Sequence, residues 1–433
     1  MKYFAPIIFL AFTAFQSNAQ SLYFPPLVGD EWDTISTVSL GWCEDDIPAL
    51  YDYLDSKNTK AFLVLKDGKI VLEKYFDTFT NDSLWYWASA GKTITSVLTG
   101  IAQTEGLLSI DDPTSDYLGT GWTSCTPEQE AAITIRNQLS MSSGLDDGVE
   151  VHCTEPECLH YLADAGERWA YHNGPYTLLG DVISEASGMT FNGFCNTRLE
   201  AQTGMSGGFV TLGENTVYIS QPRDMARFGL MVLNEGYWET EPVLADPEYF
   251  NNMVNSSQDL NLAYGYLWWL NGKSSFMVPQ SETVFDGSMI PNAPEDMFAA
   301  LGKNDQILNV VPSKNLIVVR MGENPGGIED LVPTAHNNII WNYLNGIMCE
   351  VSEVENDTKA ILEIFPNPTS ELLTIINDKM GNYSVFSSTG SCVTSGKLTG
   401  EQQTLDVSGY ENGLYFLRID TKNDVQTLKF IVH

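Results

Sequence analysis

The sequence predicts an α/β fold of the α+β kind, with one antiparallel sheet, a helical insertion and a small C-terminal β-sandwich. Two short apolar runs flank a turn near residues 61–76, and three more lie near residues 297–321. The segment between them has mainly helical and loop patterns. Strands from both ends of a domain can therefore form one sheet around the insertion. From residue 361 onward, short alternating runs separated by Gly and Asn are typical of a sandwich.

The first 19 residues predict a secretory signal peptide. Lys2 precedes an apolar run from Phe4 to Phe15, and Ser17-Asn-Ala19 has the small-x-small pattern of a cleavage site. The run is shorter than the roughly 20 residues that a membrane-spanning helix needs, and no later segment approaches that length. We therefore expect an exported protein without an integral membrane segment.

Composition excludes several classes of function. The chain has 22 Lys and Arg against 56 Asp and Glu, for a formal net charge of −34. Nucleic acids and anionic membranes need clustered basic residues, so we expect neither as a partner. Seven Cys in an exported chain predict disulfides with at least one Cys unpaired. Cys153 and Cys158 could close a small loop, and the other pairings stay open. With five His and no zinc-like spacing, we expect no metal and no cofactor.

The predicted elements follow in chain order. After an irregular lead-in, residues 60–76 predict a β-hairpin around Lys66-Asp-Gly68. A helix follows Ser89, because Ile94, Val97, Leu98 and Ile101 recur on one face before Gly106. The helical insertion covers about residues 107–260, and its clearest apolar faces begin at Leu178 and Met225.

The second half of the chain predicts the rest of the architecture. Strands are expected at 297–301, 307–311 and 316–321, and a closing helix at 335–344. These complete a body of residues 20–349. Residues 350–360 are acidic and lack apolar period, as in a linker. Residues 361–433 then form the separate sandwich.

Ser89 and Lys92 carry the first chemical signal. Three residues are nearly one helical turn, so the hydroxyl and the amine lie on one side of the helix. A serine needs a base to become a nucleophile, and a desolvated lysine can be neutral and act as that base. The backbone N–H groups at the helix start, including that of Ser89, can stabilise an oxyanion.

Two other patterns are interpreted as structural. Gly204-Met-Ser-Gly-Gly208 fits the G-x-S-x-G nucleophile elbow, but the strand that should precede it is missing, so we expect a loop. The aromatic run of residues 264–269 could line a pocket, although such runs more often belong to the core.

Three motifs in order resemble the serine β-lactamase and penicillin-binding-protein superfamily: Ser89-Ala-Gly-Lys92, residues 139–145 (Leu-Ser-Met-Ser-Ser-Gly-Leu), and Tyr171-His-Asn173 followed by Pro175-Tyr-Thr-Leu-Leu-Gly180. The resemblance covers about residues 45–348. Within the superfamily, the sequence is most similar to class C-type esterases and 6-aminohexanoate-dimer hydrolase-like proteins.

The resemblance implies a role for each residue. Ser89 would be the nucleophile, and Lys92 would help to deprotonate it. Tyr171, acting as or through a phenolate, would shuttle the proton to the leaving group, with its pKa lowered by Lys92. Asn173 would bind substrate or hold Lys92.

The third motif of the superfamily differs from the commonest pattern. Residues 300–306 (Ala-Leu-Gly-Lys-Asn-Asp-Gln) replace Lys-Thr-Gly and are nearer to the Gly-x-x-Gly-Gln form, with Asp305 where glycine is usual. The resemblance implies that this strand, with Gly302 and Lys303, supplies the second oxyanion N–H, which we assign to Lys303. The Lys303 side chain is also the charge that could meet a substrate carboxylate.

The tail resembles the C-terminal sorting domain of type IX secretion. The residues that carry this are Phe365-Pro-Asn-Pro368, 407–416 and the closing 428–432. The resemblance implies export through the periplasm to the outer cell surface or the medium, with the type IX machinery as partner. An adhesive or carbohydrate-binding sandwich is the alternative.

Together these features predict a secreted serine hydrolase that cleaves an ester or amide of a small acyl compound through a Ser89 acyl-enzyme. One alternative is a β-lactamase or D-amino-peptide hydrolase. The other is a catalytically silent surface binding protein, which Asp305 leaves open.

Overall fold

The computed structural model describes residues 22–433 except 151, 213–214, 327–331, 350–361, 378–380, 389–390, 399–401 and 422–424. The predicted signal peptide (1–19) and linker (350–360) lie outside the described residues. The chain divides into two compact units, residues 1–350 and 351–433. Each unit is described by itself.

The first unit is built on an antiparallel sheet in the order β2-β1-β13-β12-β11-β8. Its strands are β1 (Thr59–Lys66), β2 (Lys69–Tyr75), β8 (Trp269–Leu270), β11 (Phe298–Gly302), β12 (Gln306–Val311) and β13 (Leu316–Gly322). The predicted pairing of strands from both ends of the domain is confirmed, because β1 pairs with β13 along its whole length. The β1–β2 turn has φ of +53° at Asp67 and +82° at Gly68, as a tight hairpin turn requires.

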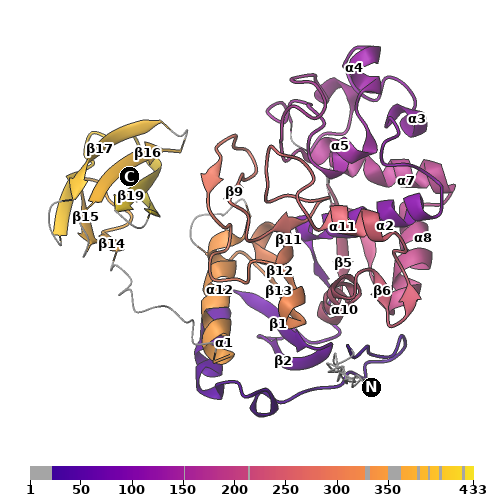
Figure 1. The fold of residues 1–433 in the computed structure, drawn as a ribbon, viewed down its shortest axis with the longest axis horizontal. Helices are drawn as coiled ribbons and strands as arrows, with labels where there is room; N and C mark the ends of the chain where they lie inside the picture. Colours follow the sequence, from indigo (N-terminus) through magenta and orange to yellow (C-terminus); the bar gives the residue numbers. More distant parts are fainter. Residues whose placement is uncertain are drawn as a thin grey trace, which may run out of the picture. The chain divides into compact units, whose positions relative to one another are not determined.

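Helices cover both faces of this sheet (Figure 1). Adjacent strand residues point to opposite faces. On one face Asn309 exchanges hydrogen bonds with Asn337 of α12 (Thr334–Ile347), beside α1 (Ile47–Ser56). On the other, Leu308 packs so tightly against Gly229 of α10 (Pro222–Leu233) that an added Cβ would lie 2.8 Å from it.

The predicted helix after Ser89 is present, and the insertion that follows it is mainly helical. Helix α2 (Lys92–Thr104) is buried over most of its length, and its apolar face ends before Gly106 at φ +70°. The other helices are α3 (Ser115–Leu118), α4 (Pro127–Ala131), α5 (Ile135–Leu139), α6 (Asn173–Thr177), α7 (Leu179–Ser187), α8 (Phe191–Cys195), α9 (Ala201–Thr203) and α11 (Pro247–Met253).

The sequence interpretation missed a second sheet, which combines a strand before the helical insertion with two strands inside it. Strands β3 (Trp85–Tyr86), β5 (Asn215–Ser220) and β4 (Gly208–Leu212) form it in that order. They are short, and the first is far from the others in sequence, so no periodic pattern marked them. The remaining short strands pair as β6 (Tyr237–Trp238) with β7 (Glu241–Pro242), and β9 (Ser275–Phe276) with β10 (Phe285–Asp286).

Two disulfides are present among the described cysteines. Cys153 pairs with Cys158, as the spacing suggested, and Cys43 pairs with Cys349, 306 residues apart. The second bond joins the segment just before α1 to the segment just after α12. Cys125, Cys195 and Cys392 are free.

The second unit is a β-sandwich with its own apolar core, as predicted. One sheet has the order β14-β15-β18 and the other β17-β16-β19-β20. The strands are β14 (Leu362–Phe365), β15 (Leu372–Asn377), β16 (Gly381–Ser387), β17 (Cys392–Leu398), β18 (Gln402–Asp406), β19 (Gly413–Thr421) and β20 (Val425–Val432).

Candidate active site

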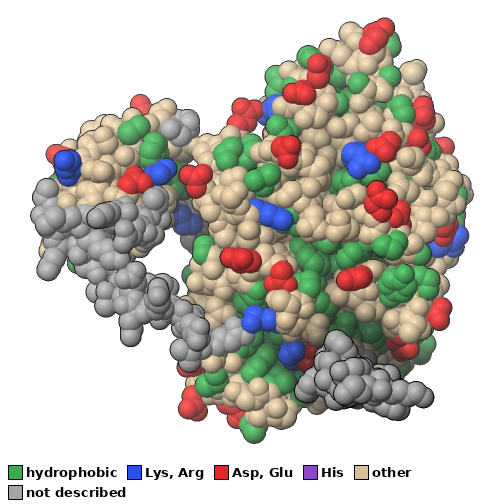
Figure 2. Space-filling model, viewed as in Figure 1, with side chains coloured by type: hydrophobic (Ala, Val, Ile, Leu, Met, Phe, Trp, Pro, Cys, Tyr) green, Lys and Arg blue, Asp and Glu red, His purple; other side chains and the backbone are tan. Residues whose placement is uncertain are grey.

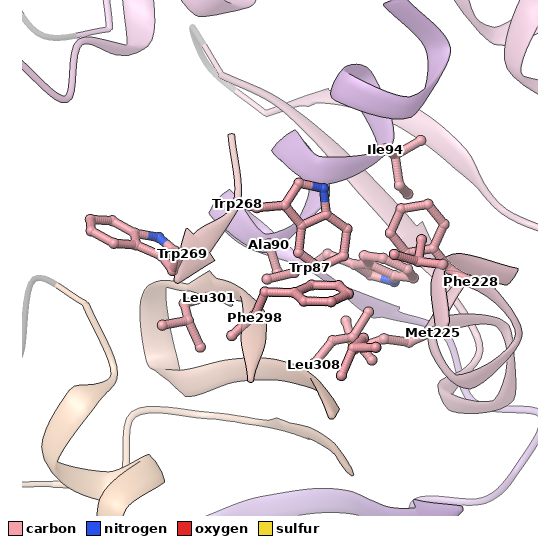
Figure 3. Close-up of a cluster of buried hydrophobic side chains, with 14 of the residues drawn as sticks. Trp87, Ala90, Ile94, Met225, Phe228, Trp268, Trp269, Phe298, Leu301 and Leu308 are labelled. Atoms are coloured by element: carbon pink, nitrogen blue, oxygen red, sulfur yellow. The ribbon is translucent and has the colours of Figure 1, made fainter. Parts of the chain in front are cut away.

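Ser89 lies in a single 3-10 turn, Ala88–Gly91, directly before α2. The turn follows directly after Trp87, which is fully buried and packs edge-on against Phe228 (Figure 3). The Trp87 indole donates to Ser220 Oγ at 2.9 Å, and its backbone N–H donates to the Tyr218 carbonyl at 2.8 Å. A buried aromatic anchor with both polar groups bonded holds the neighbouring serine in one place.

Lys92 is the first residue of α2, and its amine points back at Ser89. Its Nζ donates to Ser89 Oγ at 3.2 Å. The same Nζ lies 4.2 Å from the ring centroid of Tyr176 and 5.3 Å from that of Tyr171. Burial lowers the pKa of Lys92 from its ordinary value to about 7. A substantial fraction of this lysine is therefore neutral near pH 7 and can accept a proton.

Tyr171 lies beside Ser89, but its ionisation differs from the expectation. Its ring stacks on Trp269 at 5.8 Å between centroids and packs edge-on against Tyr264. This burial raises the pKa of Tyr171 well above the usual value, while its hydrogen bond with Ser89 acts weakly the other way. The expectation that Lys92 lowers this pKa is wrong, because desolvation of the buried phenol is the dominant effect. Tyr171 is a neutral hydroxyl at working pH.

Asn173 begins α6 and is bonded to a partner that the sequence did not suggest. Its Nδ2 lies 3.1 Å from Nδ1 of His152, rather than bonded to Lys92. Its Oδ1 is buried and has no hydrogen-bond partner among the described residues. The position is therefore compatible with a substrate contact through Oδ1, whereas the expected bond to Lys92 is not formed.

Gly302 brings β11 directly against the serine turn. A Cβ at this position would lie 2.5 Å from the Trp87 carbonyl oxygen and 3.0 Å from the Ser89 backbone nitrogen. Only glycine permits this approach. The next residue, Lys303, opens the turn between β11 and β12 with an exposed side chain. The strand end and the Ser89 N–H thus line the same spot, as an oxyanion site requires.

A cavity of about 510 Å³ opens beside Tyr171. It is lined by residues 147–149, 168–171 and 280–282. Within it, Arg168 bonds to the carboxylates of Asp147 and Glu282, each at 2.7 Å. Sequence reasoning did not identify Glu282, which comes from a loop 114 residues after Arg168 and has no motif around it.

The two patterns interpreted as structural lie where expected. Ser206 is in a loop, and its backbone N–H donates to the Asp224 carboxylate at 3.1 Å. The aromatic residues of the run 264–269 are buried in the core, and Trp269 and Tyr264 form the wall behind Tyr171. Among the described residues, no group of His, Cys, Asp and Glu is placed to hold a metal ion. No described helix is long and apolar enough to cross a bilayer.

The family model described as Beta-lactamase matches residues 56–337, which is more than half of the chain. The chain belongs to the beta-lactamase family. A second model, the secretion system C-terminal sorting domain, matches residues 363–433. This beta-lactamase-fold hydrolase therefore carries a type IX sorting domain, which directs export to the cell surface or the medium. No curated protein matches the chain significantly.

Solved structures share the beta-lactamase fold at low identity. A Bacillus anthracis protein provisionally assigned as a 6-aminohexanoate-dimer hydrolase has 18% identity and a TM-score of 0.56, over 74% of this chain and 87% of its own. A provisionally assigned Bacteroides dorei beta-lactamase has 17% identity and a TM-score of 0.57, over 71% of this chain and 100% of its own. A penicillin-binding-protein homologue from Caulobacter crescentus has 14% identity and a TM-score of 0.52, over 70% of this chain and 98% of its own.

Proposed function

We propose that this protein is a secreted serine hydrolase that cleaves an ester or amide of a small acyl compound through an acyl-enzyme at Ser89. The single observation that carries the proposal is the buried Lys92 amine 3.2 Å from Ser89 Oγ. Burial is the cause of the lowered pKa of Lys92, and it makes a neutral base available. A silent binding protein would have no use for a lysine held partly neutral against a serine.

The geometry supports two half-reactions. In the first, Lys92 takes the Ser89 proton, Ser89 Oγ bonds to the acyl carbon, and the carbonyl oxygen is stabilised by the N–H groups of Ser89 and Lys303. The neutral Tyr171 hydroxyl then donates its proton to the leaving group and is reprotonated from Lys92. In the second half-reaction, water replaces the leaving group, breaks the acyl–Oγ bond and returns the proton to Ser89.

The cavity supports a small substrate. Its volume of about 510 Å³ lies at the lower end of the usual range for small-molecule sites, roughly 300–1,000 Å³. Tyr171 belongs both to its wall and to the serine site, so an acyl or leaving group can occupy it while its carbonyl meets Ser89. Ester and amide substrates both fit this arrangement.

Intact-mass spectrometry of the exported protein tests the proposal. The protein is exposed separately to a fluorophosphonate, a p-nitrophenyl ester and a β-lactam, with Ser89→Ala as the matched variant. We expect a fluorophosphonate adduct that maps to Ser89 and is absent from the variant, with turnover of the ester. Stable acylation by the β-lactam would instead favour a penicillin-recognising enzyme. A folded wild-type protein without any adduct would overturn the proposal.

A further inference from the structure

The turn that carries Lys303 has two successive non-glycine residues with positive φ. Asn304 has φ of +59° and Asp305 has φ of +56°. Two successive residues with side chains therefore occupy the left-handed region, which backbone sterics disfavour for any residue with a Cβ, although Asn and Asp tolerate it better than most. Glycine would adopt it without strain. Such a conformation persists only when surrounding contacts hold it.

Arg320 of β13 supplies several of these contacts from beneath the turn. Its Nη1 donates to the carbonyl oxygens of Asn304 and Asp305, at 2.6 and 2.9 Å. Its Nη2 donates to the carbonyl oxygens of Lys57 and Glu323, at 2.7 and 3.1 Å. The side chain is fully buried. The guanidinium therefore ties both strained residues to the rigid centre of the sheet.

Gln306 holds the same turn from its other end. Its Nε2 donates to the carbonyl oxygens of Asn304 at 3.0 Å and Gly322 at 2.6 Å. Its Oε1 accepts the Gly322 N–H at 3.1 Å. Gln306 is fully buried and begins β12. With Arg320, it bonds the carbonyl oxygens of the turn from Lys303 to Asp305.

Because the turn lies beside Ser89, these bonds affect the geometry of the serine site as well as the stability of the fold. Gly302 is in contact with the backbone of the serine turn, so a small rotation of the next peptide changes where the Lys303 N–H points. Oxyanion donors act only if they are fixed about 2.7–3.1 Å from the developing charge. A donor on a strained turn depends on whatever fixes the strain.

We propose that Arg320 and Gln306 are positioning residues that set the Lys303 backbone N–H as the second oxyanion donor. The inference rests on the proposed function. Neither residue touches substrate. Their bonds to the turn's carbonyl oxygens hold the residues directly after the Lys303 N–H, and through them its orientation, so that stabilisation of the transition state depends on them and binding of the ground state does not.

The test compares Arg320→Met and Gln306→Met with Asn309→Ala in the full chain. Asn309 is a buried polar residue on the same strand as Gln306, but it bonds to α12 instead of the turn. With a p-nitrophenyl ester, we expect the Met variants to lose about 10–100-fold in kcat with KM within about threefold, because the lost interaction exists mainly in the transition state. Asn309→Ala should keep kcat even where it lowers the melting temperature.

A second readout separates positioning from stability. Affinity for a phosphonate transition-state analogue should fall with kcat across the series, and added guanidinium should partly restore kcat to Arg320→Ala. If Arg320→Met does not fold, Gln306→Met carries the test. Wild-type kcat in a folded Gln306→Met variant, or an equal loss in Asn309→Ala, would overturn the inference. Failure of the wild type to label at Ser89 would instead overturn the proposed function.

Discussion

At the scale of single residues, the site depends on burial more than on charge. Lys92 is nearly inaccessible and is surrounded by tyrosine rings instead of a carboxylate. A carboxylate partner would hold the lysine protonated and remove its use as a base. The same burial keeps Tyr171 protonated, so one apolar wall sets both residues in the form that the proposed acyl transfer needs.

The dependence of activity on pH should report Lys92. Below a pKa of about 7 the amine is protonated and cannot take the Ser89 proton. We expect kcat/KM for a p-nitrophenyl ester to fall about tenfold per pH unit below that value and to level off above it. Steady-state rates between pH 5.5 and 9 check this. A flat profile through pH 7 would contradict Lys92 as the base.

Replacing Lys92 should make the protein more stable while abolishing turnover. The folded pKa of Lys92 lies below its unfolded value of about 10.5, so folding costs free energy below pH 7, and the cost fades as pH rises toward 10.5. Lys92→Met removes this cost. We expect its melting temperature to exceed that of the wild type at pH 7 and the difference to shrink at pH 9.5. Lys74→Met, at an exposed lysine, is the control.

Tyr171→Phe should discriminate between leaving groups. A neutral hydroxyl that protonates the leaving group matters for an amide, whose amine leaves poorly, and little for p-nitrophenolate. We expect kcat to fall by about 10²–10⁴ with an anilide and far less with the p-nitrophenyl ester of the same acid. Equal losses with both substrates would assign Tyr171 to Ser89 orientation instead.

At the scale of elements, sequence patterns located α2 and the sheet because each has a clear period. The apolar face of α2 and the runs of β11, β12 and β13 were long enough to predict. What could not be predicted is how elements meet. No sequence pattern around Gly302 shows that it lies against the Ser89 nitrogen. Likewise, no pattern shows that Asn173, at the start of α6, bonds to His152, which precedes the Cys153–Cys158 disulfide.

The contact between β11 and the serine turn should not tolerate a side chain. In Gly302→Ala the new Cβ meets three backbone atoms at 3.0 Å or less, so the strand must move away from Ser89. We expect kcat to fall by about 10²–10³, the usual cost of an oxyanion donor. Gly208→Ala is the control, since its nearest atom would be 3.8 Å away. Unchanged kcat in folded Gly302→Ala would separate this strand from catalysis.

At the scale of the whole molecule, the two units have separate apolar cores. The sequence predicted this division from a change in pattern near residue 350, and the two family models match on either side of it. The surface of the chain carries acidic side chains scattered over the visible face instead of one charged patch (Figure 2). On this face the acidic side chains are therefore spread over a solvated surface.

Independent cores predict independent activities. A chain that ends at Glu350 keeps the serine site, all six strands of the main sheet and both disulfides. We expect its kcat/KM to stay within about twofold of the full chain, because few contacts cross a domain boundary. Fractionation of expressing cells should show that the shortened enzyme is no longer delivered to the surface. A large loss of kcat/KM would mean that the tail supports the site.

The disulfide between Cys43 and Cys349 also affects how the protein resists proteolysis from its C-terminal end. A protease that cuts beyond residue 350 creates a new chain end, and exopeptidases can then digest inward until folded structure stops them. Here the last residue before the acidic segment is cross-linked to the opposite end of the body. The disulfide therefore holds the C-terminal end of α12 in place. We expect exopeptidase digestion of the released enzyme to stop at Cys349 and to leave one uniform product.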